Sequence, residues 1–331
     1  MMGSPGRLSA AQLRVPVTVL LLSLVAALVA STLLWRAFRQ RDEARFRNAV
    51  EAAEDRIRSR LDTYVALLQA TRGFLMASHS VNRAEFREFV GAFDLRRRYP
   101  GVQGLGFTRA LRPGEREALE RAVRAEPGLQ DFRVWPETPR AEYHSIVLLE
   151  PQDRRNRAAL GYDMYTEATR QEAMARARDT GRAALSGRVT LVQEIEGPKQ
   201  AGFLLYVPVY RSTRAPEGVE SRRAALEGFV YSPFRADDLF RGIFGTESAP
   251  RVAFRVYDGR TPEPAALLHD SRALLDAPGR EAAFALTRTL EVGGRPWTLV
   301  YTSLPAFEQF SRGPLVPAFV VGSVLFSLAL F

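Results

Sequence analysis

Two pairs of acidic residues have a spacing that could support general acid–base chemistry. Asp237 and Asp238 are adjacent, whereas Glu194 and Glu196 alternate along an expected strand. The first pair stands at the start of an expected helix, where acidic side chains suit the helix dipole. The second pair is expected to lie on one face of its strand, toward solvent. The sequence therefore predicts no catalytic residue and no enzymatic activity within this chain.

Neither a metal centre nor a bound cofactor is expected. The chain has no cysteine, which excludes disulfides and thiolate ligands. Its histidines, His79, His144 and His269, lie far apart without an i, i+4 pair, so a zinc site is not predicted. The segment 104–106 (GLG) is only a fragment of a dinucleotide-binding fingerprint, because Arg109 stands where the third glycine would be.

Nucleic acid is not an expected partner, although the formal net charge is +9. The basic residues are almost all arginine, and Lys199 is the only lysine. They are scattered along the whole chain and do not form the single basic stripe that is typical of a nucleic-acid-binding surface.

Two apolar segments, residues 15–35 and 313–331, are expected to be transmembrane helices. Neither contains a charged residue, and each is about 20 residues long, enough to cross a hydrocarbon core about 30 Å thick. The first is longer than the apolar region of a typical signal peptide, which favours an uncleaved anchor. The second stops at Phe331 and is interpreted as an incomplete span, with an output domain expected beyond it.

Two signals bear on the side of the membrane that residues 36–312 occupy. Arg7 and Arg14 precede the first span, and a larger number of arginines follows it, which by itself would place the large segment inside. Long segments, however, cross membranes largely regardless of their charge. The double span therefore predicts residues 1–14 as a cytoplasmic tail and residues 36–312 outside the cytoplasmic membrane.

Residues 36–77 are expected to form a long stalk helix. Apolar side chains recur there at steps of three and four and form one stripe: Val50, Ala53, Ile57, Leu61, Tyr64 and Leu68. Two interpretations of the stripe remain open. It either packs against the domain of its own chain or forms the seam of a homodimer.

The remaining chain is expected to adopt an α+β fold of two units, residues 78–245 and 246–312. Asn82 followed by Glu85 is typical of a helix N-terminus with a capping box. Gly181 is placed to end a helix that begins near Thr169. Strands are expected at 102–108, 131–135, 143–149, 189–196, 201–210 and 228–231, with a hairpin turn at 197–199. The second unit is expected to be β-rich, with strands at 252–257, 266–269, 282–291 and 295–303.

A series of short motifs runs through the first unit in a specific order and spacing. The motifs are PGVQGLGF at 100–107, LGYDM at 160–164, ARARDTG at 175–181, LVQE at 191–194, GFLLYVPVY at 202–210 and GFVY at 228–231. Together they make residues 101–244 resemble the CHASE domain, the extracytoplasmic sensor of many bacterial histidine kinases and diguanylate cyclases and of the plant cytokinin receptors. The resemblance implies a stalk helix followed by a membrane-distal and a membrane-proximal PAS-like subdomain, with a small molecule bound in the distal one.

The resemblance also implies the ligand-binding residues. Asp163 stands where an aspartate of the plant receptors hydrogen-bonds an adenine-type ligand, although a capping role is an equal alternative. The strand that begins near Leu185 would contribute backbone groups. Phe203 and Leu205 alternate on one strand and would either line an apolar wall or pack in the core. Thr180 and Gln193, within two of the motifs, complete the expected set.

The expected function is the sensing region of a bacterial signal-transduction protein in the inner membrane, with the sensor in the periplasm. Its expected partners are the membrane, a second copy of the chain, and a small molecule that is adenine-like or bears an amide. The output domain would be a histidine kinase or a cyclic-di-GMP enzyme. The alternative functions are a membrane-tethered binding or assembly protein without enzymatic output, and a tethered enzyme.

Overall fold

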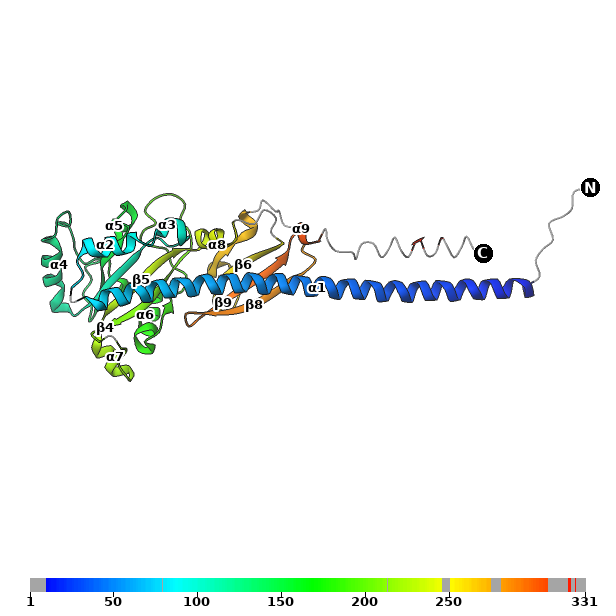
Figure 1. The fold of residues 1–331 in the computed structure, drawn as a ribbon, viewed down its shortest axis with the longest axis horizontal. Coiled ribbons are helices and arrows are strands. Elements are labelled where there is room, and N and C mark those ends of the chain that lie inside the picture. Colours follow the sequence, from blue (N-terminus) through cyan, green and yellow to red (C-terminus); the bar gives the residue numbers. More distant parts are fainter. Residues whose placement is uncertain are drawn as a thin grey trace, which may run out of the picture.

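The computed structural model describes residues 10–78, 80–212, 214–245, 251–274, 281–308, 321–322 and 325. One long helix, α1 (Ala10–Ala77), is followed by two antiparallel sheets that lie one after the other along it (Figure 1). The fold is therefore α+β, as the sequence predicts. The expected transmembrane helix at 313–331 falls almost wholly outside the described residues.

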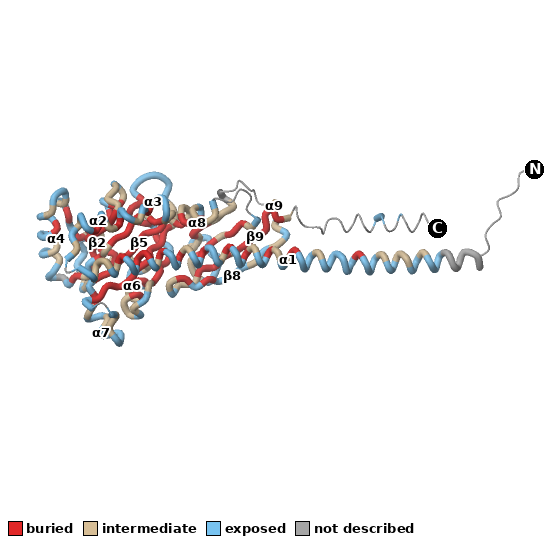
Figure 2. Tube along the Cα trace, in the orientation of Figure 1, coloured by how far each residue is buried: buried red, intermediate tan, exposed pale blue. Residues whose placement is uncertain are grey.

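The N-terminal part of α1 has the character of a membrane anchor. The helical stretch Val17–Ala77 contains an apolar window long enough, by length and composition, to cross a membrane. Apolar side chains such as Val19, Leu22 and Leu28 are exposed there (Figure 2). In a protein surrounded by water, such side chains would be covered by other parts of the chain.

The first sheet has the strand order β2-β1-β5-β4-β3. Its strands are β1 (Leu105–Leu111), β2 (Tyr143–Glu150), β3 (Ala184–Leu185), β4 (Gly202–Tyr210) and β5 (Leu226–Arg235). The helices of this part of the chain are α2 (Arg83–Gly91), α3 (Leu95–Arg98), η1 (Pro113–Glu115), α4 (Arg116–Arg124), α5 (Arg154–Ala159), η2 (Met164–Thr166), α6 (Ala168–Thr180), α7 (Val219–Ala225) and α8 (Ala236–Phe244).

The second sheet has the strand order β7-β6-β9-β8. It consists of β6 (Val252–Asp258), β7 (Leu267–Asp270), β8 (Ala285–Val292) and β9 (Arg295–Ser303). Short helical turns accompany it, namely η3 (Pro264–Ala266), η4 (Ser271–Leu274) and α9 (Pro305–Glu308). The tight turn between β8 and β9 is formed by Gly293 and Gly294, both at positive φ, which favours glycine at these two positions.

Local sequence signals set several element boundaries. Asn82 caps α2: its side chain accepts from the Glu85 amide, and the Glu85 carboxylate accepts from the Asn82 amide. Gly181 ends α6 in the left-handed conformation at φ 72°. Both predictions are confirmed.

The apolar stripe of α1 packs against the sheets of its own chain. Tyr64, for example, lies with its ring 5.0 Å from that of Phe234 and donates a 2.7 Å hydrogen bond to the Pro100 carbonyl. The stripe is buried in one continuous core with both sheets: Phe46, Val50, Ala53, Ile57, Leu61, Tyr64 and Leu68. Its interpretation as a dimer seam is therefore wrong, because intrachain packing already covers these side chains. A homodimer would have to use other surfaces.

Two predicted strands are absent from the described residues. The segment 189–196 makes only an isolated bridge between Val189 and Gly202, and 131–135 makes only one between Trp135 and Tyr162. The hairpin expected at 197–199 is therefore wrong, and β3 pairs with β4 instead. Glu194 also differs from expectation, since its side chain is 1% exposed and lies 2.8 Å from Arg235 Nε. The sequence predicts Glu194 on the solvent side of an extended strand. In the structure it is buried and forms an ion pair with Arg235.

Candidate functional site

The two faces of the first sheet pack against different elements. One face shares the core of α1 and includes Phe203 and Leu205 of β4. The opposite face includes Leu204 and Tyr206 of the same strand and packs against α6. Because side chains alternate along a strand, neighbouring residues of one motif belong to two separate cores.

Asp163 is fully buried at the N-terminus of η2, on the α6 side of the sheet. Its Oδ1 accepts hydrogen bonds from the His144 amide at 2.8 Å and the Tyr165 amide at 3.1 Å. Its Oδ2 lies 3.3 Å from Arg140 Nε, and neither of these two atoms has a hydrogen bond to another described residue. One oxygen therefore caps the turn, while the other is available to a further donor.

Gly161 brings the Asp163 segment against residues 133–135. The Asp163 amide donates to the Trp135 carbonyl at 2.7 Å, and the Trp135 amide donates to the Gly161 carbonyl at 3.0 Å. At Gly161, where φ is +79°, a Cβ would lie 1.9 Å from the Arg133 carbonyl oxygen. Only glycine permits this close approach, which in turn positions the Asp163 carboxylate.

His144 and Tyr165 extend the cluster. Their rings lie 4.0 Å apart, and His144 Nε2 is 3.0 Å from Glu142 Oε1. His144 Nδ1 and the Tyr165 hydroxyl are buried and lack a hydrogen-bond partner in the described ranges. Burial lowers the pKa of His144, and burial also raises the pKa of Tyr165, so both side chains are neutral near pH 7. The cluster therefore combines a buried carboxylate and a partly exposed guanidinium with two neutral groups that can donate or accept.

The family model that describes the CHASE domain matches residues 79–269, more than half of the chain. This chain belongs to the CHASE domain family. It carries an extracytoplasmic ligand-binding sensor domain of this type, and the matched family is sensory and not catalytic. Among curated proteins, none matches the sequence.

Solved structures of bacterial sensor proteins are similar to this CHASE chain at low identity. An extracellular ligand binding receptor from Desulfohalobium retbaense is 14% identical with a TM-score of 0.46, over 78% of this chain and 40% of that one. The ligand-binding domain of the Pseudomonas aeruginosa amino acid chemoreceptor PctC, in complex with GABA, is 11% identical with a TM-score of 0.43, over 77% and 95%. A domain of a sensory box/GGDEF family protein from Vibrio parahaemolyticus is 9% identical with a TM-score of 0.37, over 80% and 99%.

The other sequence-predicted site residues of the CHASE domain do not gather around Asp163. Phe203 and Leu205 lie on the α1 face, where the Phe203 ring stacks on Phe234 at 5.0 Å. Thr180 is exposed at the end of α6 and donates its hydroxyl to the Arg176 carbonyl at 2.7 Å. Their roles in ligand binding stay predictions.

Leu185 and Gln193 are both buried, and Leu185 pairs with Leu205 of β4. The Leu185 amide donates to the Gly293 carbonyl of the second sheet at 3.0 Å, and its carbonyl accepts from Arg176 Nη2 at 2.6 Å. Both backbone groups of Leu185 are thus engaged within the chain. They connect α6 and the β8–β9 turn.

Sequence reasoning missed Arg170, a buried arginine of the CHASE domain with 2% exposure. Its Nε lies 2.5 Å from Glu167 Oε2, its Nη2 donates to the Thr190 carbonyl at 3.1 Å, and its guanidinium lies 5.2 Å from the Tyr162 ring centroid. No motif marks this residue. From sequence alone, an arginine on a helix is expected to be exposed, and the burial of Arg170 depends on the tertiary fold. Arg140, which faces Asp163, was missed because an arginine in a loop is also expected to be exposed.

The burial of His144 predicts an acid-sensitive stability. Because the folded-state pKa of His144 lies below its unfolded value of about 6.5, the unfolded chain takes up a proton first as the pH falls. Stability should therefore decrease from pH 7.5 to 5.5, with at most about 1.4 kcal/mol per pH unit coming from this residue. Urea unfolding of the full chain in detergent at both values should show a smaller decrease for His144→Gln than for wild type.

The difference between the two proteins isolates His144. Groups that titrate equally in both proteins cancel. The usual pKa of Glu142, 4.5, already lies below this window, and the hydrogen bond with His144 lowers it further in wild type. Asp163 and Arg178, the other charges that act on His144, are present in both proteins. Equal pH slopes for wild type and His144→Gln would show that the imidazole does not titrate on unfolding.

Proposed function

We propose that this chain is the periplasmic sensing region of a signalling protein in the bacterial inner membrane, and that the cluster around Asp163 binds its small-molecule ligand. The observation that carries the proposal is the set of buried polar atoms without hydrogen-bond partners in the described structure. These are Asp163 Oδ2, Arg140 Nε, His144 Nδ1 and the Tyr165 hydroxyl. Asp163 Oδ2 and Arg140 Nε lie 3.3 Å apart as an ion pair without a hydrogen bond, and the other two atoms have no partner among the described residues. Buried polar groups of folded proteins are nearly always hydrogen-bonded, so such a cluster is suited to a ligand that completes it.

The chemistry of these atoms favours a ligand with adjacent N–H and acceptor groups. A ligand N–H would donate to Asp163 Oδ2, and a carbonyl or ring nitrogen would accept from Arg140 or the Tyr165 hydroxyl. An amide and an adenine-type ring both offer this pair. We infer an uncharged, planar or amide-bearing molecule, since a carboxylate would be repelled by Asp163.

The signal would pass from the first sheet, the membrane-distal subdomain of the proposal, to the second, membrane-proximal one. Support comes from contacts between α6 and the second sheet, where Arg295 forms an ion pair with Asp258 and lies 3.6 Å from Glu172 of α6. A ligand that binds two arrangements of these elements with different affinity would shift their populations. The output domain, a histidine kinase or a cyclic-di-GMP enzyme, would lie beyond this chain.

Asp163→Asn tests the ligand assignment. Asparagine retains Oδ1 as an acceptor for the two backbone amides but removes the charge, so the turn should stay capped while ligand binding weakens by about tenfold to a hundredfold. The full chain in lipid nanodiscs would be titrated calorimetrically with adenine and with nicotinamide, alongside thermal melting. At least one of these probes should bind the wild type.

Asp153→Asn is the matched control. Asp153 also caps a helix, accepting from the Asn156 amide at 2.9 Å, but it lies at the exposed start of α5. It should leave probe affinity unchanged. An Asp163→Asn protein that melts earlier but binds with wild-type affinity would make Asp163 a cap only, and failure of both probes to bind wild type would refute the proposed ligand class.

A further inference from the structure

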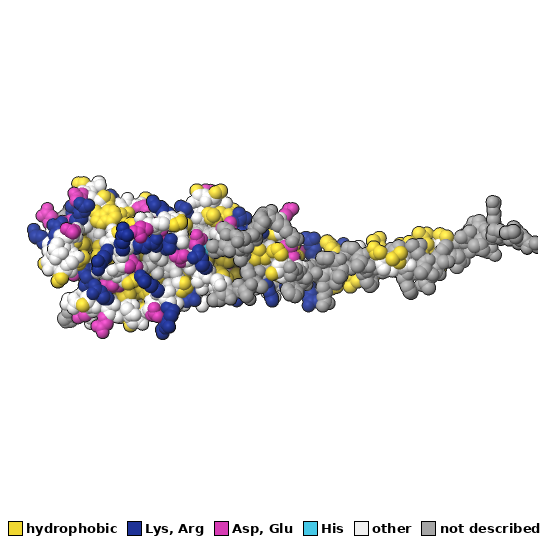
Figure 3. All heavy atoms as spheres, turned by 90° about the horizontal axis from the view of Figure 1, so that it is seen from above, with side chains coloured by type: hydrophobic (Ala, Val, Ile, Leu, Met, Phe, Trp, Pro, Cys, Tyr) yellow, Lys and Arg dark blue, Asp and Glu magenta, His cyan; other side chains and the backbone are white. Residues whose placement is uncertain are grey.

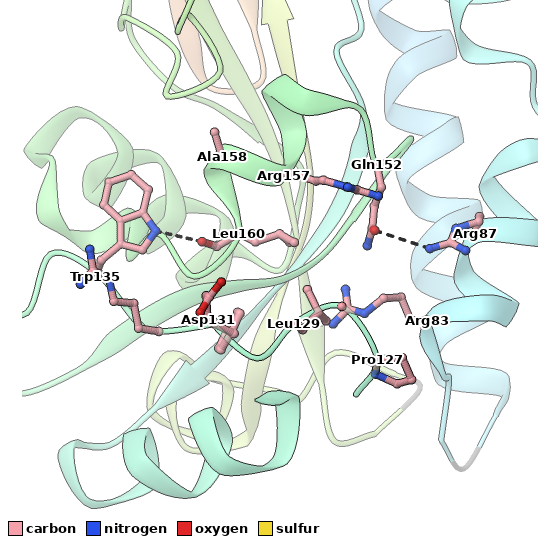
Figure 4. Close-up of a pocket in the computed structure, with 13 residues that line it drawn as sticks. Arg83, Arg87, Pro127, Leu129, Asp131, Trp135, Gln152, Arg157, Ala158 and Leu160 are labelled. Carbon is pink, nitrogen blue, oxygen red and sulfur yellow. Dashed lines mark hydrogen bonds between the residues drawn. The ribbon is translucent and has the colours of Figure 1, made fainter. Parts of the chain in front are cut away.

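A groove of about 640 Å³ lies at the β2 edge of the first sheet, between α2, residues 127–135 and α5 (Figure 4). This size is within the range of pockets for small organic ligands. It lies outside the set of unpartnered atoms described around Asp163. Its lining combines four arginines with apolar side chains: Arg83, Arg87, Arg133, Arg157, Leu129, Trp135 and Leu160.

The arginines on the α2 side are held in place by the protein. Arg83, whose side chain is 13% exposed, binds Glu126 through Nε at 2.8 Å and the Val147 carbonyl through Nη1 at 2.9 Å. Arg87 lies 3.3 Å from Glu150 through Nε. A guanidinium has five N–H donors, so each keeps donors for a further acceptor.

Arg157 gives the groove its unmatched positive charge. Glu126 and Glu150 pair with Arg83 and Arg87, and Arg133 lies 3.7 Å from Glu137. Arg157 has no acidic partner among the described residues. In Figure 4, Arg157 and Arg87 approach the side chain of Gln152 from opposite sides. Gln152 Nε2 is buried and has no hydrogen-bond partner within the described part of the chain. A guanidinium and an amide N–H together suit the two oxygens of a carboxylate.

The opposite end of the groove sets a limit on the charge of the ligand. Asp131 lies near Trp135 there (Figure 4). Arg133 also lines the groove, but it is paired with Glu137, so Asp131 would repel a second negative group. Leu129 and Leu160 offer apolar surface between the two ends, and the Trp135 ring offers more at the Asp131 end (Figure 4). The Trp135 ring is held in place, because its Nε1 donates to the Leu160 carbonyl at 2.9 Å.

We propose that this groove is a second binding site, which takes a small monocarboxylate with a flat apolar body. The carboxylate binds Arg157 and Gln152, and the apolar body lies against Leu129, Leu160 and Trp135. The site goes beyond the proposed sensing function, and it differs from the Asp163 cluster in the charge that it accepts.

Phenylacetate and its neutral isostere phenylacetamide are the probes that test the site. The full chain in lipid nanodiscs should bind phenylacetate with a dissociation constant near or below about 1 mM, the range open to a ligand of this size. Phenylacetamide should bind at least about tenfold more weakly, because it lacks the charge. Tryptophan fluorescence should respond to phenylacetate in wild type and not in Trp135→Phe. Of the other two tryptophans, Trp297 is buried in the core and Trp35 lies in the apolar N-terminal part of α1, outside the groove.

Arg157→Gln should weaken phenylacetate binding at least about tenfold by calorimetry. Arg154→Gln is the matched control on the same helix, because its side chain is 81% exposed, pairs with Glu196 and does not line the groove. Equal affinity of Arg157→Gln and wild type, equal affinity for the two probes, or no saturable binding by wild type would each overturn the proposal. Competition by adenine or nicotinamide would place the carboxylate in the Asp163 cluster and would also overturn it.

Discussion

Gly161→Ala should lower the free energy of unfolding by about 3–5 kcal/mol, whereas Gly128→Ala should lower it by only about 1–2 kcal/mol. Both glycines have a φ of +79°, so an alanine at either position carries the same cost of a left-handed backbone. At Gly128 a Cβ would meet no atom within 4 Å, but at Gly161 it would meet the Arg133 carbonyl oxygen at 1.9 Å. Urea unfolding of the full chain in detergent, followed by circular dichroism, measures both.

The comparison separates backbone conformation from close approach. The excess loss at Gly161 should be accompanied by displacement of the Asp163 segment, because the Gly161 carbonyl and the Asp163 amide both bond to Trp135. Adenine or nicotinamide binding should therefore fail in Gly161→Ala and persist in Gly128→Ala. Equal losses of stability in the two variants would mean that residues 133–135 can move away freely, and would contradict the rigid positioning of Asp163.

Phe203→Ala should lower the free energy of unfolding by about 3–5 kcal/mol, the usual cost of removing a fully buried phenylalanine. Phe203 is 0% exposed, and its ring stacks on Phe234 at 5.0 Å and meets the edge of Trp297 at 5.2 Å. Trp297 belongs to β9, so the cavity would open where the two sheets meet. The same urea experiment measures this loss.

The affinity of the surviving folded protein decides the role of Phe203. We expect nicotinamide or adenine to bind Phe203→Ala as they bind wild type, because this side chain lies on the α1 face and Asp163 on the α6 side. Phe107→Ala, at a half-buried position of β1, should cost less stability and serves as the control. A large fall in affinity with little loss of stability would instead support the predicted apolar ligand wall.

Signals that act within a few residues were sufficient to predict much of the local structure. Asn82 and Glu85 satisfy each other's backbone amides, and Gly181 adopts a conformation that other residues avoid, so both boundaries follow from short-range chemistry. The 3.6-residue period of the stalk predicts a long helix, because an amphipathic helix has this period whichever partner covers its apolar stripe. The ordered motifs likewise predicted the CHASE family.

Contacts between distant segments decided the rest. Periodicity shows that a face of α1 is apolar but not what covers it, and the sheets of the same chain cover it. Alternation in β4 shows that Phe203 and Leu205 share a face, yet only the packing of α1 and α6 on opposite sides separates them from Asp163. Glu194 is buried in an ion pair with Arg235, which lies 41 positions away along the chain, and no local sequence pattern predicts this pairing. The groove beside β2 exists because α2, residues 127–135 and α5 meet there, and such a meeting depends on the tertiary fold alone.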